Sequence, residues 1–212
     1  NYGEEEKKGL FGLRKKVSNQ IASVKAEYAK AAAAEAAAQA SINAIIAQMQ
    51  AEEEAARQEA ANNGQDYTGT GSTATGTYIW PCPSCTYVTS KFGMREHPLF
   101  GDERPHTGID IGAQAGAEVI AADSGTVAVA TYSSSYGNYV TIYHSNGDYT
   151  LYAHMSSLTV TAGQNVTQGD VIGYVGSTGW ASGPHLHFEI RVNGSTVDPT
   201  SYFSGLSYAP DA

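Results

Sequence analysis

Six histidines fall between positions 97 and 187, and the spacing of several is typical of a metal site. In residues 185–192 apolar and polar side chains alternate, so His185 and His187 point to one face of a strand, opposite an apolar face. Two positions apart, the imidazoles lie about 6–7 Å from each other. Because both face away from the predicted core, we interpret them as functional groups rather than core histidines.

Two other runs offer similar side chains. His106 and Asp110 point away from Ile109 and Ile111. In a straight strand they would stand about 13 Å apart, too far to share one metal ion. A turn is therefore required between them, and Gly108 is able to make it.

The third run, residues 150–155, carries His154. Alternation predicts that Leu151, Ala153 and Met155 share one face, with Tyr152 and His154 on the other. Three strands thus each offer an imidazole or a carboxylate from the face away from the core.

Neutral imidazoles and one carboxylate suit zinc, and three protein ligands leave a fourth position for water. The five candidates exceed what a closed four-ligand site uses; they are His106, Asp110, His154, His185 and His187. The surplus predicts imidazoles that act on bound water, which is typical of metal-assisted hydrolysis. Polar surface histidines and a structural site are the alternatives.

The composition excludes several classes of protein. The 212 residues carry a formal net charge of −9, which argues against nucleic acid as a partner because phosphate binding needs a basic face. No apolar run approaches the eighteen or so residues of a membrane span. No basic and apolar leader precedes Asn1, which we read as a secreted protein that has been trimmed or truncated.

Residues 1–62 read as one long helix. They consist mainly of Ala, Glu, Gln, Lys and Arg, with no glycine after Gly12, and apolar residues recur in a heptad. The seam is imperfect, since Arg14, Glu35 and Glu52 occupy core positions and the middle is rich in alanine. We expect a coiled coil that needs a partner: a second copy, a missing helix or the other domain.

A change of composition follows the helix. Residues 63–78 are rich in Gly, Ser and Thr and predict a flexible linker. Residues 79–212 show short alternating runs separated by turn residues, with an Asn-Gly hairpin signal at 146–147. The predicted fold class is α+β: a long N-terminal coiled-coil helix (1–62), a linker (63–78) and a mainly antiparallel β-sheet domain (79–212).

At its histidine runs the sequence resembles the lysostaphin/LytM-type zinc endopeptidases of bacterial peptidoglycan. The matching motifs, in the family's order, are Phe92-Gly-Met-Arg-Glu-His-Pro98, His106-Thr-Gly-Ile-Asp110, Asn138-Tyr-Val-Thr-Ile142, Leu151-Tyr-Ala-His154, Gly169-Asp-Val-Ile-Gly173 and Ser177–Glu189 with its His-Leu-His. Residues 100–105 lack the tyrosine of the lysostaphin-like members, so a preference for glycine bridges does not carry over.

The resemblance implies one Zn²⁺ per chain, bound by His106, Asp110 and His187. His154 and His185 would be the catalytic pair, one taking a proton from water and the other steadying the oxyanion. It also implies a metallopeptidase domain that cleaves stem peptides or cross-bridges outside the bacterial cytoplasm, at the cell wall or after secretion. The coiled coil would self-associate, bind a regulatory partner or fold back over the site.

The alternative from another class is a non-catalytic wall-binding activator of a separate hydrolase, as in family members that have lost ligands. The intact ligand set favours the enzyme. Asn138 and Trp180 are candidate substrate contacts, and Cys82 and Cys85 predict a local disulfide, with pairing between chains as the alternative. We expect Arg95 and His97 to be structural or to support the metal ligands from behind, and His144 to lie at the surface of the hairpin.

Overall fold

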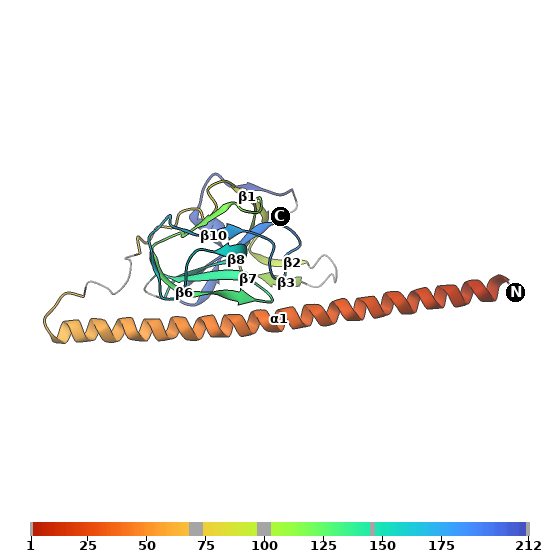
Figure 1. Ribbon diagram of the computed structural model, residues 1–212, viewed down its shortest axis with the longest axis horizontal. Coiled ribbons are helices and arrows are strands. Elements are labelled where there is room, and N and C mark those ends of the chain that lie inside the picture. Colours follow the sequence, from red (N-terminus) through yellow and green to blue (C-terminus); the bar gives the residue numbers. More distant parts are fainter. Residues whose placement is uncertain (1, 68–73, 97–102, 145–146, 211–212) are drawn as a thin grey trace.

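The computed structural model describes residues 2–67, 74–96, 103–144 and 147–210. Within these residues a long helix, α1 (Tyr2–Asn62), precedes a β-rich domain (Figure 1). The strands are β1 (Tyr87–Ser90), β2 (Gly93–Glu96), β3 (Glu103–His106), β4 (Ile109–Gly112), β5 (Glu118–Ile120), β6 (Gly125–Ser133), β7 (Gly137–Tyr143), β8 (Tyr149–Leu158), β9 (Asn165–Val166), β10 (Val171–Val175), β11 (His185–Val192), β12 (Ser195–Val197) and β13 (Ser207–Tyr208), with a short 3₁₀ helix, η1 (Pro199–Tyr202).

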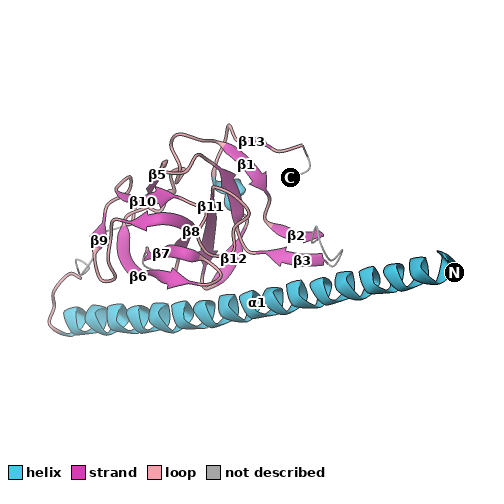
Figure 2. Cartoon of the chain, turned by 45° about the vertical axis from the view of Figure 1, so that its right-hand side comes forward, coloured by secondary structure: helices cyan, strands magenta, loops and turns pink. Residues whose placement is uncertain are grey.

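The strands form one large sheet in the order β13-β1-β4-β11-β8-β7-β6-β9, with β10, β5 and β12 attached beside this path. All pairings in it are antiparallel except that of β1 with β13. β2 and β3 form a separate antiparallel pair, and Figure 2 shows it beside the large sheet. The predicted antiparallel β domain is confirmed, and β7 and β8 pair on either side of the predicted hairpin turn, of which residues 145–146 lie outside the described residues.

The main core lies on one face of the central strands. Ile109 of β4, Phe188 of β11 and Tyr152 of β8 are fully buried in it. Alternation along β11 places Leu186, Phe188 and Ile190 in this core and leaves the histidines on the opposite face. Burial of the core face therefore fixes the register of the strands, and this register sets the positions of the polar side chains on the other face.

Helix α1 packs on that opposite face of the sheet. Ile42 and Ile46 are buried in a second apolar cluster, which also contains Val129 of β6 and Leu151 and Ala153 of β8. Burial of each isoleucine contributes roughly 1.5–3 kcal/mol. The β-rich domain of the same chain is thus a partner for the C-terminal half of the predicted seam, the last of the three partners considered.

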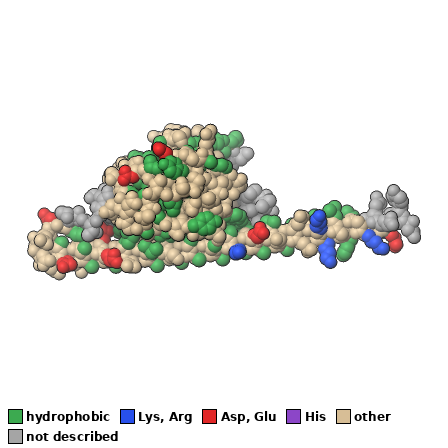
Figure 3. All heavy atoms as spheres, in the orientation of Figure 1, with side chains coloured by type: hydrophobic (Ala, Val, Ile, Leu, Met, Phe, Trp, Pro, Cys, Tyr) green, Lys and Arg blue, Asp and Glu red, His purple; other side chains and the backbone are tan. Residues whose placement is uncertain are grey.

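The N-terminal half of α1 extends past the domain (Figures 1 and 2). Its apolar side chains are exposed, among them Leu10, Leu13, Val17, Ile21 and Val24. Figure 3 shows Lys and Arg side chains on this overhang. A coiled coil is not shown by the structure and stays a prediction for this half. Among the described residues, no helix has the length and apolar character needed to cross a membrane.

The segment around the two cysteines is folded into the domain. Cys82 is buried in the main core, and Cys85 donates a hydrogen bond from its thiol to the carbonyl of Gly112. Both are free thiols in this structure. The expected local disulfide is therefore not formed here, and pairing stays a prediction.

His144 is not a surface residue, contrary to the expectation from its place beside the hairpin. It is almost fully buried, with Nδ1 2.9 Å from the carbonyl oxygen of Ser124 and Nε2 2.7 Å from Oγ1 of Thr150. Burial lowers its pKa, so the imidazole is neutral at neutral pH. The imidazole can be buried here because these two partners satisfy both ring nitrogens.

Candidate metal centre

Two adjacent strands and one turn bring His106, Asp110 and His187 together. In the antiparallel pair of β4 and β11, Asp110 lies directly opposite His187. His106 ends β3, and the chain turns through residues 107–108 before β4 begins. Gly108 is needed there because a Cβ would overlap the carbonyl oxygen of Phe188 on β11. The glycine thus allows close approach of the turn to β11, which draws His106 towards Asp110.

The three side chains present one donor atom each to a common point. Nε2 of His106 lies 3.2 Å from Oδ1 of Asp110 and 3.1 Å from Nδ1 of His187. Nδ1 of His187 lies 2.9 Å from the same Oδ1. Ligand atoms on a tetrahedral zinc ion with bonds near 2.0–2.1 Å are about 3.3 Å apart. Two imidazole nitrogens and one carboxylate oxygen at these separations fit zinc.

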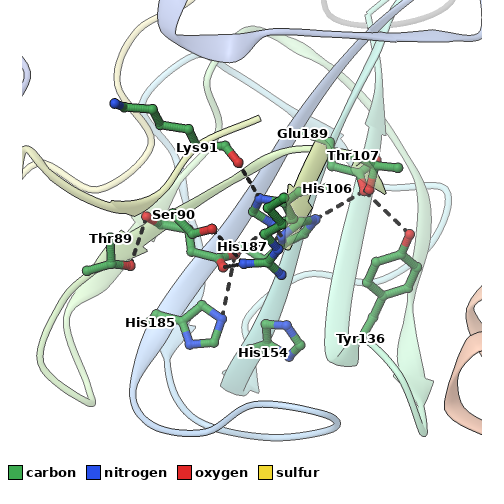
Figure 4. Close-up of polar contacts among 12 residues, drawn as sticks. Thr89, Ser90, Lys91, His106, Thr107, Tyr136, His154, His185, His187 and Glu189 are labelled. Carbon is green, nitrogen blue, oxygen red and sulfur yellow. Dashed lines mark hydrogen bonds and ion pairs between the residues drawn. The ribbon is translucent and has the colours of Figure 1, made fainter. Parts of the chain in front are cut away.

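The other nitrogen of each ligand imidazole is held by an acceptor. Nδ1 of His106 lies 2.8 Å from the carbonyl oxygen of Lys91, and Nε2 of His187 lies 3.1 Å from Oε1 of Glu189 (Figure 4). A proton donated to each of these acceptors leaves the lone pair of the facing nitrogen directed at the common point. Such contacts set the tautomer and orientation of metal-binding histidines.

The charged groups of the site shift one another's pKa values. Burial would raise the pKa of Asp110, but hydrogen bonds from His106 and His187 hold it well below its usual range. Burial would lower the pKa of His187, but Asp110 and Glu189 outweigh it and raise this pKa to about 10. The two carboxylates therefore make the space around His187 strongly attractive to positive charge, whether a proton or a metal ion.

Glu189 is hydrogen-bonded to several side chains next to the three converging residues. It is fully buried and accepts hydrogen bonds from Thr107 (2.6 Å), from Nε of Arg191 (2.8 Å) and from Tyr136 (3.4 Å), besides its contact with His187. Burial acts to raise its pKa, yet His187 and Arg191 lower it to about 2. The carboxylate is therefore ionised and fixed in position.

His154 reaches the site through an irregularity of β8. Ala153 lies opposite His187 and faces the same side, so regular alternation would direct His154 into the main core. Instead His154 has φ +64°, and the register between β7 and β8 shifts at this point. The predicted faces of this strand are thus wrong: Leu151 and Ala153 face α1, while Tyr152 and Met155 lie in the main core. A bulge, which alternation does not reveal, turns His154 back to the site.

His154 and His185 lie side by side next to the ligands (Figure 4), with ring centroids 4.7 Å apart. Nδ1 of His154 contacts the carbonyl oxygen of Thr178 at 2.8 Å, and Nδ1 of His185 contacts that of Gly183 at 2.9 Å. With these nitrogens as donors, each Nε2 keeps a lone pair. Burial and the nearby His187 and His185 lower the pKa of His154 to about 4, so it is neutral at neutral pH.

The remaining predicted residues have varied positions. Asn138 donates from its amide to the carbonyl oxygens of Met155 and Ser156, which secures the chain just after the β8 bulge. Trp180 is 47% exposed, with its ring centroid 4.4 Å from that of Tyr28 on α1. Substrate contacts of Asn138 and Trp180 stay predictions.

Arg95 and His97 are the residues expected to be structural or to support the ligands. Arg95 donates to Ser90 and lies 3.7 Å from Oδ2 of Asp110. His97 lies outside the described residues.

Sequence reasoning did not single out Glu189, Arg191, Tyr136 or Thr107 as parts of the site. The alternation of residues 185–192 already places Glu189 and Arg191 on the face of His187, and a buried acid beside a buried base is the signal that could have identified them. Tyr136 and Thr107 lie on other segments, and no local pattern connects them to β11.

Comparison with known proteins agrees with this geometry. Residues 104–199 match peptidase family M23. The chain is 48% identical over 116 residues to a DD-carboxypeptidase/endopeptidase of Neisseria meningitidis, covering 55% of this chain and 27% of that protein. It is 42% identical over 113 residues to a peptidoglycan DD-endopeptidase of Vibrio cholerae, covering 53% of this chain and 26% of that protein.

A solved structure is similar as well. A zinc-containing peptidase from Vibrio cholerae aligns with a TM-score of 0.56 and 34% identity, covering 61% of this chain and 40% of that one. The fold and the site are thus those of a zinc metallopeptidase domain, and residues 104–199 are similar to the domain of peptidase family M23. The chain spans about a quarter of the length of the two curated relatives.

Proposed function

We propose that this chain is a zinc-dependent endopeptidase that hydrolyses peptide bonds in bacterial peptidoglycan. The observation that carries the proposal is the convergence of three zinc-type donor atoms beside two imidazoles that each keep a lone pair. A relative of this domain is named a peptidoglycan DD-endopeptidase, which supports stem peptides or cross-bridges as the substrate. Such a substrate places the protein outside the bacterial cytoplasm.

His106, Asp110 and His187 are the proposed ligands of one zinc ion. Zinc in this position supplies Lewis-acid activation of a water molecule and of the scissile carbonyl. Lys91 and Glu189 hold the two imidazoles in the tautomers that binding requires. The register of β4 against β11 keeps Asp110 next to these imidazoles.

His154 and His185 are the proposed catalytic pair. A neutral imidazole with a free Nε2 can take the proton of the attacking water and then donate it to the leaving amine. Its neighbour, once protonated, can donate a hydrogen bond to the oxyanion that develops on the peptide carbonyl. The carbonyls of Thr178 and Gly183 fix the orientation of both rings.

Digestion of purified sacculi by the full chain, with products read by mass spectrometry, tests this function. We expect one zinc per chain by elemental analysis, loss of digestion with a chelator and recovery on adding zinc. A His187→Ala chain is the matched control and should bind no zinc. Failure of the unaltered chain to take up zinc would overturn the proposal. If the unaltered chain then accelerated a separate wall hydrolase, it would be an activator instead.

We further propose that the overhang of α1 self-associates as a coiled coil. The exposed stripe of Leu10, Val17 and Val24 continues the face by which the rest of the helix packs on the domain. Residues at this spacing form the seam of paired helices. A regulatory partner helix is the other occupant that this stripe would accept.

A further inference from the structure

Helix α1 lies on the same face of the sheet as the metal centre. In the pairing of β8 with β11, Ala153 stands opposite His187 and Leu151 opposite Glu189. Residues directly opposed in antiparallel strands project to one face. Because Leu151 and Ala153 share one buried cluster with Ile42 and Ile46 of α1, the helix lies on the face from which His187 and Glu189 project.

Glu35 is held between two points where α1 touches the domain. Tyr28 packs edge-on against Trp180, and Ile42 is fully buried. Residues seven apart on a helix return to nearly the same side after two turns, about 10.5 Å along the axis. Glu35 lies seven residues from each contact, so it faces the domain, where its side chain is half-buried.

Glu35 lies within electrostatic range of the metal centre. Its carboxylate interacts electrostatically with His187, Glu189 and His106, and also with Arg191. Burial raises its pKa, and the two histidines oppose this rise. No other acidic residue occurs between Glu27 and Glu52, in a stretch of which half is alanine. A single carboxylate of this stretch is therefore within electrostatic range of the histidines of the metal centre.

We propose that α1 is an autoinhibitory strap: with Glu35 held over the metal centre, the docked helix keeps peptide out of the site, and the site opens when α1 leaves this face. This inference rests on the proposed peptidase function. Trp180, a candidate substrate contact, packs against Tyr28 in the docked state. Substrate and helix thus compete for one face.

The strap is attached by contacts that can be lost without unfolding the sheet. Besides the isoleucines, it is held by hydrogen bonds from Gln39 to the Tyr149 hydroxyl (3.0 Å), from Tyr149 to Asn43 (2.9 Å) and from Tyr143 to Glu53 (2.8 Å). All of these belong to the second apolar cluster or its edge, and the main core lies on the other face. Residues 63–78 connect helix and domain, so release needs no cleavage of the chain.

The test uses the full chain with Ile42→Asp as the release variant and Ile45→Asp as the matched control. Ile45 is 37% exposed and does not belong to the docked cluster. Hydrogen exchange in residues 38–49 reports docking, and circular dichroism reports retained folding.

We expect Ile42→Asp to undock the helix and to raise sacculus digestion about ten-fold or more, since released states of switches are typically populated at 10% or less. Ile45→Asp should match the unaltered chain. Tyr28→Ala, which removes the contact at the site end, should raise digestion in the same direction.

Zinc affinity, measured by competition with a chelator, tests the position of Glu35 without relying on activity. Glu35→Gln should weaken zinc binding about five-fold in the docked chain, as expected for the loss of one nearby charge. It should have no effect in the Ile42→Asp background. An unchanged affinity in the docked chain, or undocking that leaves measurable digestion unchanged, would overturn the strap. A third outcome separates the strap from the peptidase function. If no variant digests sacculi, but Glu35→Gln still weakens zinc binding in the docked chain and not in the Ile42→Asp background, the strap stands and the peptidase function fails.

Discussion

Glu189 shows how one buried side chain organises the candidate site. It contacts a proposed zinc ligand, His187, and a buried cation, Arg191, and neither partner has more than 7% of its side chain exposed. A buried carboxylate is unfavourable unless its charge and its oxygens are satisfied. Here both conditions are met, so Glu189 can fix the ring of His187 without loss of stability.

Replacement of Glu189 by Gln should damage metal binding and folding together. The amide cannot balance Arg191, and breaking a buried ion pair costs about 3–5 kcal/mol. Loss of the group that orients a metal-binding histidine lowers metal affinity about 10–100-fold. Chelator competition and urea unfolding would measure the two effects.

Glu118→Gln is the control for this prediction, because Glu118 is an exposed carboxylate on β5 and should change neither quantity. Full zinc affinity in the Glu189→Gln chain would show that the orientation of His187 does not depend on this acid.

At the scale of single elements, the bulge in β8 determines the position of a catalytic candidate. Regular strands β4 and β11 deliver Asp110, His185 and His187 by alternation alone. β8 delivers His154 only because its backbone adopts φ +64° there. This region is costly for most residues but is tolerated by Asn and Asp, and Asn193 occupies it elsewhere in this chain at φ +50°.

Two substitutions at position 154 should separate strain from chemistry. His154→Asn fits the left-handed backbone, so we expect its free energy of unfolding to remain within about 1 kcal/mol of the original. His154→Val, with a branched Cβ, should lose about 1–2 kcal/mol more. Both should reduce sacculus digestion about 100-fold or more, as expected for loss of a proton-transfer group.

Denaturant unfolding and digestion rates measure the two effects. Equal stability of the Asn and Val variants would contradict the role assigned to the backbone, and near-normal digestion by His154→Asn would contradict the catalytic one.

At the scale of the whole molecule, charge and apolar surface are divided between two parts. Residues 1–62 carry eight basic and nine acidic residues, whereas residues 63–212 carry four and twelve. One helix face serves both parts: its C-terminal half packs on the sheet, and its N-terminal half is exposed beyond it. Two separate interactions, docking and association, can therefore be tested on one helix.

Disruption of the exposed stripe should abolish association without affecting docking. In sedimentation experiments we expect the full chain to dimerise as concentration rises and Val17→Asp/Ile21→Asp to remain monomeric, because two buried charges oppose seam packing. Asn19→Asp/Ser23→Asp adds the same charge on the opposite side of the helix and should behave like the unaltered chain. A monomeric unaltered chain at all concentrations would contradict self-association and favour a partner helix.

Local patterns in the sequence are sufficient for much of this architecture. Alternation along residues 185–192 predicts the face shared by His185 and His187, and helix-forming residues predict α1, because both depend on backbone geometry within a few residues. The family motifs add the expected ligand set. The same patterns misassign the faces of residues 150–155 and the exposure of His144, since a bulge and a buried hydrogen-bond pair depend on neighbouring strands.

Residue types and their spacing indicate a long helix before a β-rich domain with zinc-type ligands. Assembly of the strands is what shows that three donor atoms converge, that Glu189 holds His187, and that α1 packs on the same face of the sheet. The physical reason is that convergence depends on strand register and close approach, as at Gly108 against Phe188. Docking of α1 likewise depends on an apolar sheet face, built by Leu151 and Ala153, that is recognised only once the strands are assembled.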